Sequence, residues 1–316
     1  MPETAARAKT DGVAAAARRR LRLSLLALWA TGAAAAQTPV CDGLVGDERD
    51  LATRMLATHY LYDCCDRTMA ECLEQEPTCR LAVRLANNLC RRVALGQDEA
   101  TIERALSRRG RSAMDPRVCQ FDLAPGVAAA AGADTARVAV VEYACARCPF
   151  CALLTPALHR EVTAGRLRGK VRLYFKAWPI RSHAHSKETN LGLAAAMHLG
   201  EFWPFLLHAF GHFDDFGPET QAAWAAQAGL DRVAFEAAVA DPAVAARLVE
   251  SKKEGLRHGV HATPTFFIDG REYVGDLGVE EMVDVLLEAW DRAAGRDYLP
   301  SPRTGAEPAT GTQTSQ

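Results

Sequence analysis

The sequence predicts an α/β fold, built around a strand–helix–strand unit and preceded by a small disulfide-rich α-helical domain. Two apolar strand patterns, at 137–143 and 171–177, flank a helix that begins at Pro149. Six of the ten cysteines fall in the first third of the chain, on segments with helical spacing. With 316 residues, 49% of them hydrophobic, the chain is long enough to form two domains with real cores.

The first 36 residues have the pattern of a secretory signal peptide. Arg18–Arg20 and Arg22 precede an apolar run from Leu23 to Ala36, and we expect cleavage near Ala36. An N-terminal membrane anchor is the alternative, although the run is shorter than the roughly 20 apolar residues of a bilayer span. We therefore expect an exported, periplasmic protein whose cysteines mostly form disulfides.

Residues 37–112 are expected to form the cysteine-rich helical domain. Its six cysteines are Cys41, Cys64, Cys65, Cys72, Cys79 and Cys90. One helix is indicated by Leu81, Leu85, Leu89 and Val93, which recur every four residues, and Asp98 can cap the next helix. If Cys79 and Cys90 share a helix, they lie about 16 Å apart and must each find another partner. The roughly fifteen pairings that six cysteines allow stay open.

Residues 113–136, rich in Ala and Gly in their second half, are interpreted as a linker that includes a first strand. The second domain is expected at 137–295, with a helical insertion at about 187–259. Pro156 falls inside the helix that starts at Pro149 and should kink it. The alternative is that this helix ends near Leu154.

The end of the second domain has a hairpin pattern. Two short strands, Thr265–Ile268 and Arg271–Val274, flank the turn dipeptide Asp269-Gly270. A final helix is expected at Val279–Trp290, with an apolar face. The remaining residues, 296–316, are rich in Thr, Gly, Pro and Gln and are predicted to be a disordered tail.

The segment Cys148-Pro149-Phe150-Cys151 has the spacing of a redox-active dithiol at a helix start. Unpaired N–H groups and the positive end of the helix dipole lower the pKa of a cysteine at this position. Pro149 fits the first helical position, where an N–H has no intrahelical partner. Cys148 is therefore expected to be the exposed nucleophile and Cys151 the resolving thiol. A structural disulfide and half of a zinc site are the alternatives for a lone C-x-x-C.

Residues 115–295 resemble a DsbA-type thiol:disulfide oxidoreductase with a thioredoxin-like fold. The matching motifs, in chain order, are Val141-Glu142-Tyr143, Cys148-Pro149-Phe150-Cys151, Phe202-Trp203-x-Phe205 and Gly259-Val260-x-x-Thr263-Pro264-Thr265-Phe266-Phe267-Ile268. The resemblance implies a cis peptide bond at Pro264, with Thr263 facing the substrate. It also implies that Glu142 is a buried acid beneath the disulfide, which exchanges a proton with the resolving cysteine. A surface position at the end of the strand is the alternative for Glu142. Thr263, Pro264 and Phe150 are the residues expected to bind substrate.

The helical segment is also similar to the periplasmic domain of the cytochrome c maturation protein CcmH. The similarity covers Leu61-x-x-Cys64-Cys65 and the helices that follow. Because Tyr62 stands where that family has the first cysteine of a C-x-x-C, the redox role of that motif is not carried over. We interpret this domain first as a structural helical staple and second as a surface for docking a partner.

Other candidate residues are the cysteines and histidines outside these motifs. Cys145 stands where the DsbA family often has an acidic residue, and it is expected to pair with Cys119 or to be a free regulatory thiol. His208 and His212 have i, i+4 spacing, yet no third metal ligand is near them in the sequence. No metal and no cofactor are expected.

These observations predict an exported thiol:disulfide oxidoreductase that exchanges the Cys148-Cys151 disulfide with protein thiols. Its expected partners are protein thiol or disulfide substrates and a membrane or soluble redox partner. The net charge of −2, without a basic cluster past the N-terminus, argues against nucleic acid. Because Pro149-Phe150 lacks a histidine, we expect a less oxidising couple than in the strongest oxidases, which leaves oxidase, isomerase and reductase roles open. The alternative functions are a redox-inert thioredoxin-fold binding module and an assembly factor for cytochrome c maturation.

Overall fold

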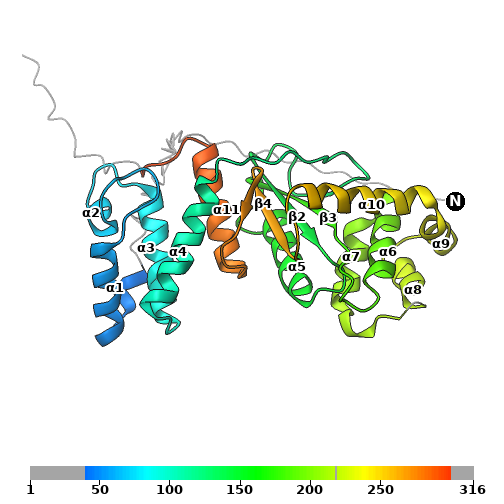
Figure 1. The fold of residues 1–316 in the computed structure, drawn as a ribbon, viewed down its shortest axis with the longest axis horizontal. Helices are drawn as coiled ribbons and strands as arrows, with labels where there is room; N and C mark the ends of the chain where they lie inside the picture. Colours follow the sequence, from blue (N-terminus) through cyan, green and yellow to red (C-terminus); the bar gives the residue numbers. More distant parts are fainter. Residues whose placement is uncertain (1–39, 218, 300–316) are drawn as a thin grey trace, which may run out of the picture. The chain divides into compact units, whose positions relative to one another are not determined.

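The computed structural model describes residues 40–217 and 219–299. The predicted signal peptide lies outside these residues, as does the predicted tail from residue 300 onward. In the described part, the chain has a thioredoxin-like α/β fold with a helical insertion, preceded by a small disulfide-rich helical region (Figure 1). The predicted fold class is thus confirmed.

The centre of the second domain is a five-stranded mixed sheet in the order β1-β3-β2-β4-β5. Its strands are β1 Ala129–Ala131, β2 Val138–Ala144, β3 Val171–Ala177, β4 Thr265–Ile268 and β5 Arg271–Tyr273. Strands β2 and β3 are parallel and the other pairs are antiparallel. The strand β1 lies inside the predicted linker, and β5 ends one residue before the predicted Val274. The central strand β2 places Glu142 opposite Phe175 of β3 and Phe266 of β4.

Alternation along β2 sends its side chains to two different cores. Val138 and Val140 pack with the helices α5 (Pro149–Thr163) and α11 (Val279–Ala293) on one face. On the other face, Val141 and Tyr143 pack with Phe267 and with residues of the segment 119–123. The helix α5 continues through Pro156 to Thr163 and does not end near Leu154.

The helices between β3 and β4 form the insertion, drawn in green to yellow in Figure 1. They are α6 Ser186–His198, α7 Phe202–Gly211, α8 Thr220–Gln227, α9 Arg232–Ala240 and α10 Pro242–Arg257, with a short 3₁₀ turn at Phe213–Asp215. Their apolar faces share a core with Phe175 of the sheet and with the buried Cys148 and Cys151. The insertion therefore packs directly against the dithiol.

The N-terminal region consists of a 3₁₀ turn and four helices held by three disulfides. These elements are Val40–Gly43, α1 Gly46–Thr58, α2 Met69–Leu73, α3 Arg80–Ala94 and α4 Glu99–Met114. The disulfides are Cys41–Cys90, Cys64–Cys79 and Cys65–Cys72, so Cys79 and Cys90 each find a partner outside α3, as their spacing predicts. Asp98 caps α4 by accepting a hydrogen bond from the Thr101 N–H. All three bonds connect residues within this one region.

Arginines of α3 and α4 connect the helical region to α11 of the second domain. Arg109, 1% exposed, lies 2.7 Å from Asp284 and 2.7 Å from Glu288. Arg92 lies 3.0 Å from Glu281. Arg84 lies 3.0 Å from Asp284. Because these partners are distant in the sequence, the two regions are joined by a buried ionic cluster as well as by the chain.

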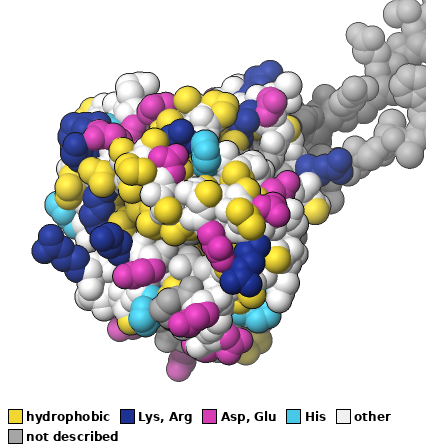
Figure 2. Space-filling model, turned by 90° about the vertical axis from the view of Figure 1, so that its right-hand side faces the viewer, with side chains coloured by type: hydrophobic (Ala, Val, Ile, Leu, Met, Phe, Trp, Pro, Cys, Tyr) yellow, Lys and Arg dark blue, Asp and Glu magenta, His cyan; other side chains and the backbone are white. Residues whose placement is uncertain are grey.

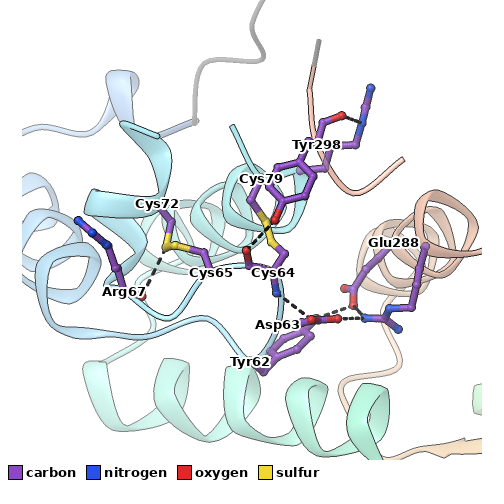
Figure 3. Close-up of a disulfide and its surroundings, with 11 residues drawn as sticks. Tyr62, Asp63, Cys64, Cys65, Arg67, Cys72, Cys79, Glu288 and Tyr298 are labelled. Carbon is purple, nitrogen blue, oxygen red and sulfur yellow. Dashed lines mark hydrogen bonds and ion pairs between the residues drawn. A yellow bond between two sulfur atoms is a disulfide. The ribbon is translucent and has the colours of Figure 1, made fainter. Parts of the chain in front are cut away.

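The residues after α11 run back to the disulfide-rich region. The predicted tail begins at 296, yet residues 297–299 pair with residues 78–80, and Tyr298 forms a bridge with Cys79. The Tyr298 hydroxyl donates a hydrogen bond to the Cys64 carbonyl over the Cys64–Cys79 disulfide (Figure 3). Residues 297–299 are therefore held against the helical region by backbone hydrogen bonds.

Candidate active site

The dithiol lies at the N-terminus of α5, where β2 ends. Cys148 is the residue before the first helical position, Pro149 occupies that position, and Cys151 lies one turn further on. Both cysteines are thiols in this structure. A turn brings them into place, since the Cys148 N–H donates to the Cys145 carbonyl at 3.0 Å. The positions of Cys148, Pro149 and Cys151 at the helix start are the ones that the spacing predicts.

The two thiols of this pair have opposite acidities. A hydrogen bond from the Cys151 thiol, together with backbone N–H groups of the helix start, lowers the pKa of Cys148 to about 5, although burial opposes this. Burial raises the pKa of Cys151 far above its usual range, and the nearby charges of Glu142 and Cys148 add to the effect. At neutral pH, Cys148 is therefore a thiolate and Cys151 a thiol, which suits a nucleophile and a resolving cysteine.

Cys148 is less accessible than the sequence suggests, because only 2% of it is exposed. The expectation of an exposed nucleophile is therefore wrong for this conformation. The physical reason is the loop before β4, since the Cys148 Sγ lies 3.3 Å from the Thr263 carbonyl, to which the thiol form of Cys148 donates a hydrogen bond. The Thr263–Pro264 peptide bond is cis, as the resemblance implies. Next to the sulfur, Phe150 is 69% exposed.

Glu142 is completely buried in the middle of β2, and the alternative of a surface position is wrong. Its Oε1 accepts a hydrogen bond of 2.5 Å from the Thr155 hydroxyl on α5. Its Oε2 is buried and has no hydrogen-bond partner among the described residues. Burial raises the pKa of Glu142 to about 8, and the charge of Cys148 adds to this while the Thr155 hydrogen bond opposes it. The carboxyl group is thus largely protonated at neutral pH and coupled to both cysteines.

Three features of the site were not predicted from the sequence. Thr155 is one of them, and its position four residues after Cys151 was the available signal, because i and i+4 share a helix face. The second is a polar cage around the buried Cys145, whose Sγ lies 3.1 Å from the Ser186 hydroxyl and 3.5 Å from the Asn190 amide. Cys145 is therefore a free thiol directed at α6 and does not pair with Cys119, which is also free.

The third feature is the aromatic packing of Arg147, the residue before the nucleophile. Its guanidinium lies 4.5 Å from the Phe213 ring centre and 5.1 Å from that of Phe216. It also donates a hydrogen bond to the Phe213 carbonyl. Arg147 thus connects the dithiol loop to the turn after α7. No sequence motif in this turn predicts the contact.

Histidines and charged side chains elsewhere form no recognisable centre in the described residues. The rings of His208 and His212 stack with centres 4.1 Å apart, and no cluster of three metal-ligating side chains occurs in the described ranges. On the face shown in Figure 2, basic and acidic side chains are mixed with hydrophobic ones. None of the helices described in the structure is long and apolar enough to cross a membrane.

Most of the second domain matches the sequence model of a known protein family. A family model described as thioredoxin matches residues 126–288, which include β1 to β5 and the dithiol. This range does not reach the helical region, so the similarity of that region to CcmH stays a prediction.

The chain is also similar to parts of two curated proteins. One is a Na⁺/H⁺ antiporter NhaA of Herminiimonas arsenicoxydans, 30% identical over 200 residues, which cover 62% of this chain and 31% of the antiporter. The other is the Na⁺/H⁺ antiporter NhaA 3 of Salinispora tropica, 29% identical over 230 residues, which cover 72% of this chain and 32% of that protein. The chain spans about a third of the length of these relatives.

Among solved structures, the chain is similar to a thioredoxin-like oxidoreductase from Silicibacter pomeroyi, with 23% identity and a TM-score of 0.45 over 54% of this chain and 93% of that one. It is also similar to BdbD from Bacillus subtilis in its oxidised form, with 15% identity and a TM-score of 0.47 over 55% and 99% of the two chains. For α-DsbA1 of Wolbachia pipientis the identity is 19% and the TM-score 0.46, over 54% and 94%.

Proposed function

Since this chain belongs to the thioredoxin family, we propose that it is an exported thiol:disulfide oxidoreductase that exchanges the Cys148-Cys151 disulfide with thiols of extracytoplasmic proteins. The observation that carries this proposal is the placement of Cys148 at the start of α5, one turn before Cys151 and against the loop of the cis Thr263–Pro264 bond. The lowered pKa of Cys148 and the raised pKa of Cys151 agree with it. Three disulfides in the helical region are in keeping with an oxidising compartment.

The exchange would proceed in two balanced steps. A substrate thiolate attacks the Cys148 sulfur of the oxidised pair, and the bond to Cys151 breaks. Cys151 leaves with the electron pair of that bond and takes up a proton, for which Glu142 is the nearby buried donor. A second substrate thiolate then attacks the substrate sulfur of the mixed disulfide and releases Cys148 as a stable thiolate. The substrate loses two electrons and the dithiol gains them.

Substrate would bind at the rim formed by Phe150 and the loop of Thr263 and Pro264. An exposed phenylalanine beside the sulfur offers apolar contact to an unfolded segment. Because the Thr263 carbonyl contacts Cys148, an extended peptide paired with this loop would carry its own sulfur close to the nucleophile.

The redox potential of the pair tests the proposal. A Cys148 pKa of about 5 lies between those of thioredoxin, about 7, and of DsbA, about 3.5. We therefore expect a potential between the corresponding values of about −270 and −120 mV. Equilibration of residues 37–316 with glutathione buffers, followed by mass-spectrometric mapping, would measure it. The three disulfides of the helical region should remain intact and serve as internal references.

A potential below about −300 mV would identify the Cys148-Cys151 bond as structural. That result would favour the redox-inert binding module, which also predicts that Cys148→Ser leaves function intact. The matched control is Cys119→Ser, because Cys119 is a free cysteine that does not belong to the dithiol.

A further inference from the structure

Thr155 makes an unusual use of its hydroxyl group. A threonine inside a helix commonly donates to the carbonyl four residues earlier, as Thr163 does at the end of the same helix, with 2.7 Å to the His159 carbonyl. The Thr155 hydroxyl instead leaves its helix and donates to Glu142 Oε1 on β2 at 2.5 Å. Both residues are completely buried. The bond therefore connects the dithiol helix to the buried acid.

This hydrogen bond decides which carboxyl oxygen holds the proton. A protonated carboxyl group has one accepting and one donating oxygen. Since Oε1 accepts from Thr155, the proton of neutral Glu142 belongs on Oε2. Oε2 is the oxygen that lacks a partner among the described residues, and an unpaired buried polar atom is costly. Oε2 is therefore free to give its proton to an acceptor that forms beside it in another state of the protein.

The surroundings of Glu142 leave the two cysteines as its proton-exchange partners. Phe175 and Phe266 lie opposite it on the paired strands, and both are apolar. The helix α11 adds the apolar Met282, Val283 and Leu286 to the core on this side of the sheet. From α5, Thr155 binds Oε1, and Cys151 lies one turn before Thr155 on the same helix face. Cys148 and Cys151 are the titratable groups to which Glu142 is coupled in the described structure.

We propose that Thr155 is a positioning residue, which fixes Oε1 of Glu142 so that the proton on Oε2 is presented to the sulfur of Cys151 as that sulfur leaves. This inference rests on the proposed function. A thiol of high pKa is a poor leaving group, so a proton delivered to it accelerates the break of the disulfide. Thr155 itself acts through its hydrogen bond to Glu142 and exchanges no proton with the sulfur.

The test is the rate at which glutathione attacks the oxidised protein, measured by acid quench, alkylation and intact mass between pH 6 and 9.5. Each rate is divided by the glutathione thiolate concentration. In the unmodified protein the corrected rate should fall as Glu142 loses its proton. In Thr155→Val we expect a roughly tenfold lower rate at pH 6 to 7, because the proton is no longer kept on Oε2. The fall should also move to higher pH, since a hydrogen bond that favours the charged carboxylate is lost.

Thr155→Ser keeps the hydroxyl and should restore both the rate and the position of the fall. Thr155→Ala is a second variant without the hydroxyl, in case valine disturbs the fold. Thr163→Val is the matched control on the same helix, and its profile should superimpose on that of the unmodified protein.

The positioning role is overturned if Thr155→Val and Thr155→Ala leave the profile unchanged while Glu142→Gln abolishes the fall. If Glu142→Gln also leaves the profile unchanged, the proton-transfer role of Glu142 in the proposed function is overturned as well.

Discussion

Two of the regions that hold buried carboxyl groups in the described structure give them opposite surroundings. At the contact between α11 and the helical region, Asp284 faces two arginines, Arg84 and Arg109, which hold its pKa below the usual value although burial opposes this. Under the dithiol, Glu142 faces one hydroxyl and no cation that the described structure shows, and its pKa is raised to about 8. Glu142 is fully buried and the Asp284 side chain is only 16% exposed, so burial penalises the charged form of both groups and does not by itself explain the opposite directions of their pKa shifts.

The opposite pKa shifts of Asp284 and Glu142 suit the two carboxyl groups to different roles. A carboxylate with its cations stays charged throughout the physiological range, so it can hold two parts of the protein together but cannot deliver a proton. A carboxyl group without a cation is protonated at neutral pH and loses its proton when a nearby charge or proton acceptor changes. The cluster at α11 therefore serves structure, and Glu142 is suited to chemistry.

Removal of the central cation of the cluster should have the largest effect on stability. Arg109→Met leaves Asp284 and Glu288 buried with fewer positive partners, and we expect a loss of about 3–5 kcal/mol in the free energy of unfolding. Urea titration at pH 7 under non-oxidising, non-reducing conditions measures it. Arg54→Met is the control, since Arg54 forms an exposed pair with Glu99 and should cost less than about 1 kcal/mol. Equal losses in the free energy of unfolding of Arg109→Met and Arg54→Met would contradict a structural role of the cluster.

The pH dependence of the free energy of unfolding should distinguish Glu142, which has no cationic partner among the described residues, from Asp284, which has two. Folded Glu142, with a pKa near 8, keeps a proton that the unfolded chain releases above about pH 4.5, so its contribution to stability is lost as pH rises towards 8. Asp284 has a lowered pKa and loses its contribution only when pH falls below about 4. Between pH 5.5 and 8.5 the oxidised protein should therefore become less stable relative to Glu142→Gln, by up to about 3 kcal/mol, because burial, the largest cause of the raised pKa, is present in the oxidised form while the charge of Cys148 is not.

The oxidised form is the right one for this measurement, because Cys148 and Cys151 do not titrate while they are joined. In the reduced protein, the lowered pKa of Cys148 would add stability as pH rises from about 5 to 8.5 and would mask the effect of Glu142. The difference between the protein and Glu142→Gln removes the contribution of the histidines, which both forms share. A difference that stays constant with pH would mean that Glu142 is ionised in the folded state.

The sequence predicts what local patterns encode. The limits of β3 and β4 agree with the apolar runs and with the Asp269-Gly270 turn, and the helix start at Pro149 follows from its proline and the two cysteines. Glu142 and Pro264 were identified because each lies in a motif that resembles a known family. The strand β1 is three alanines, whose pairing with β3 comes from the sheet and not from any alternation of its own.

What the sequence does not predict depends on contacts between distant segments. The three disulfides are one arrangement of about fifteen, and spacing excludes only the pairing of Cys79 with Cys90. Thr155 is one polar residue on a mostly apolar helix until β2 places Glu142 against it. The arginines of α3 and α4 look like an ordinary charged helix surface, and their carboxylate partners lie about 170 to 210 residues further along the chain.

The smallest predicted effect concerns Tyr62, which lies at the contact between the helical region and α11. Its hydroxyl donates a 2.6 Å hydrogen bond to Glu288, as Figure 3 shows, and burial raises its pKa well above the usual value. Tyr62→Phe removes one bond to a carboxylate that keeps Arg109 and Arg292 as partners, so we expect a loss of about 1–2 kcal/mol in urea titration. Tyr60→Phe, at a 67% exposed position, should change stability by less than about 0.5 kcal/mol. A loss as large as that of Arg109→Met would show that the Tyr62 hydroxyl stabilises buried Glu288 as much as the Arg109 guanidinium does. The contrast between Asp284 and Glu142 would then have to be explained by hydrogen bonds as well as by cations.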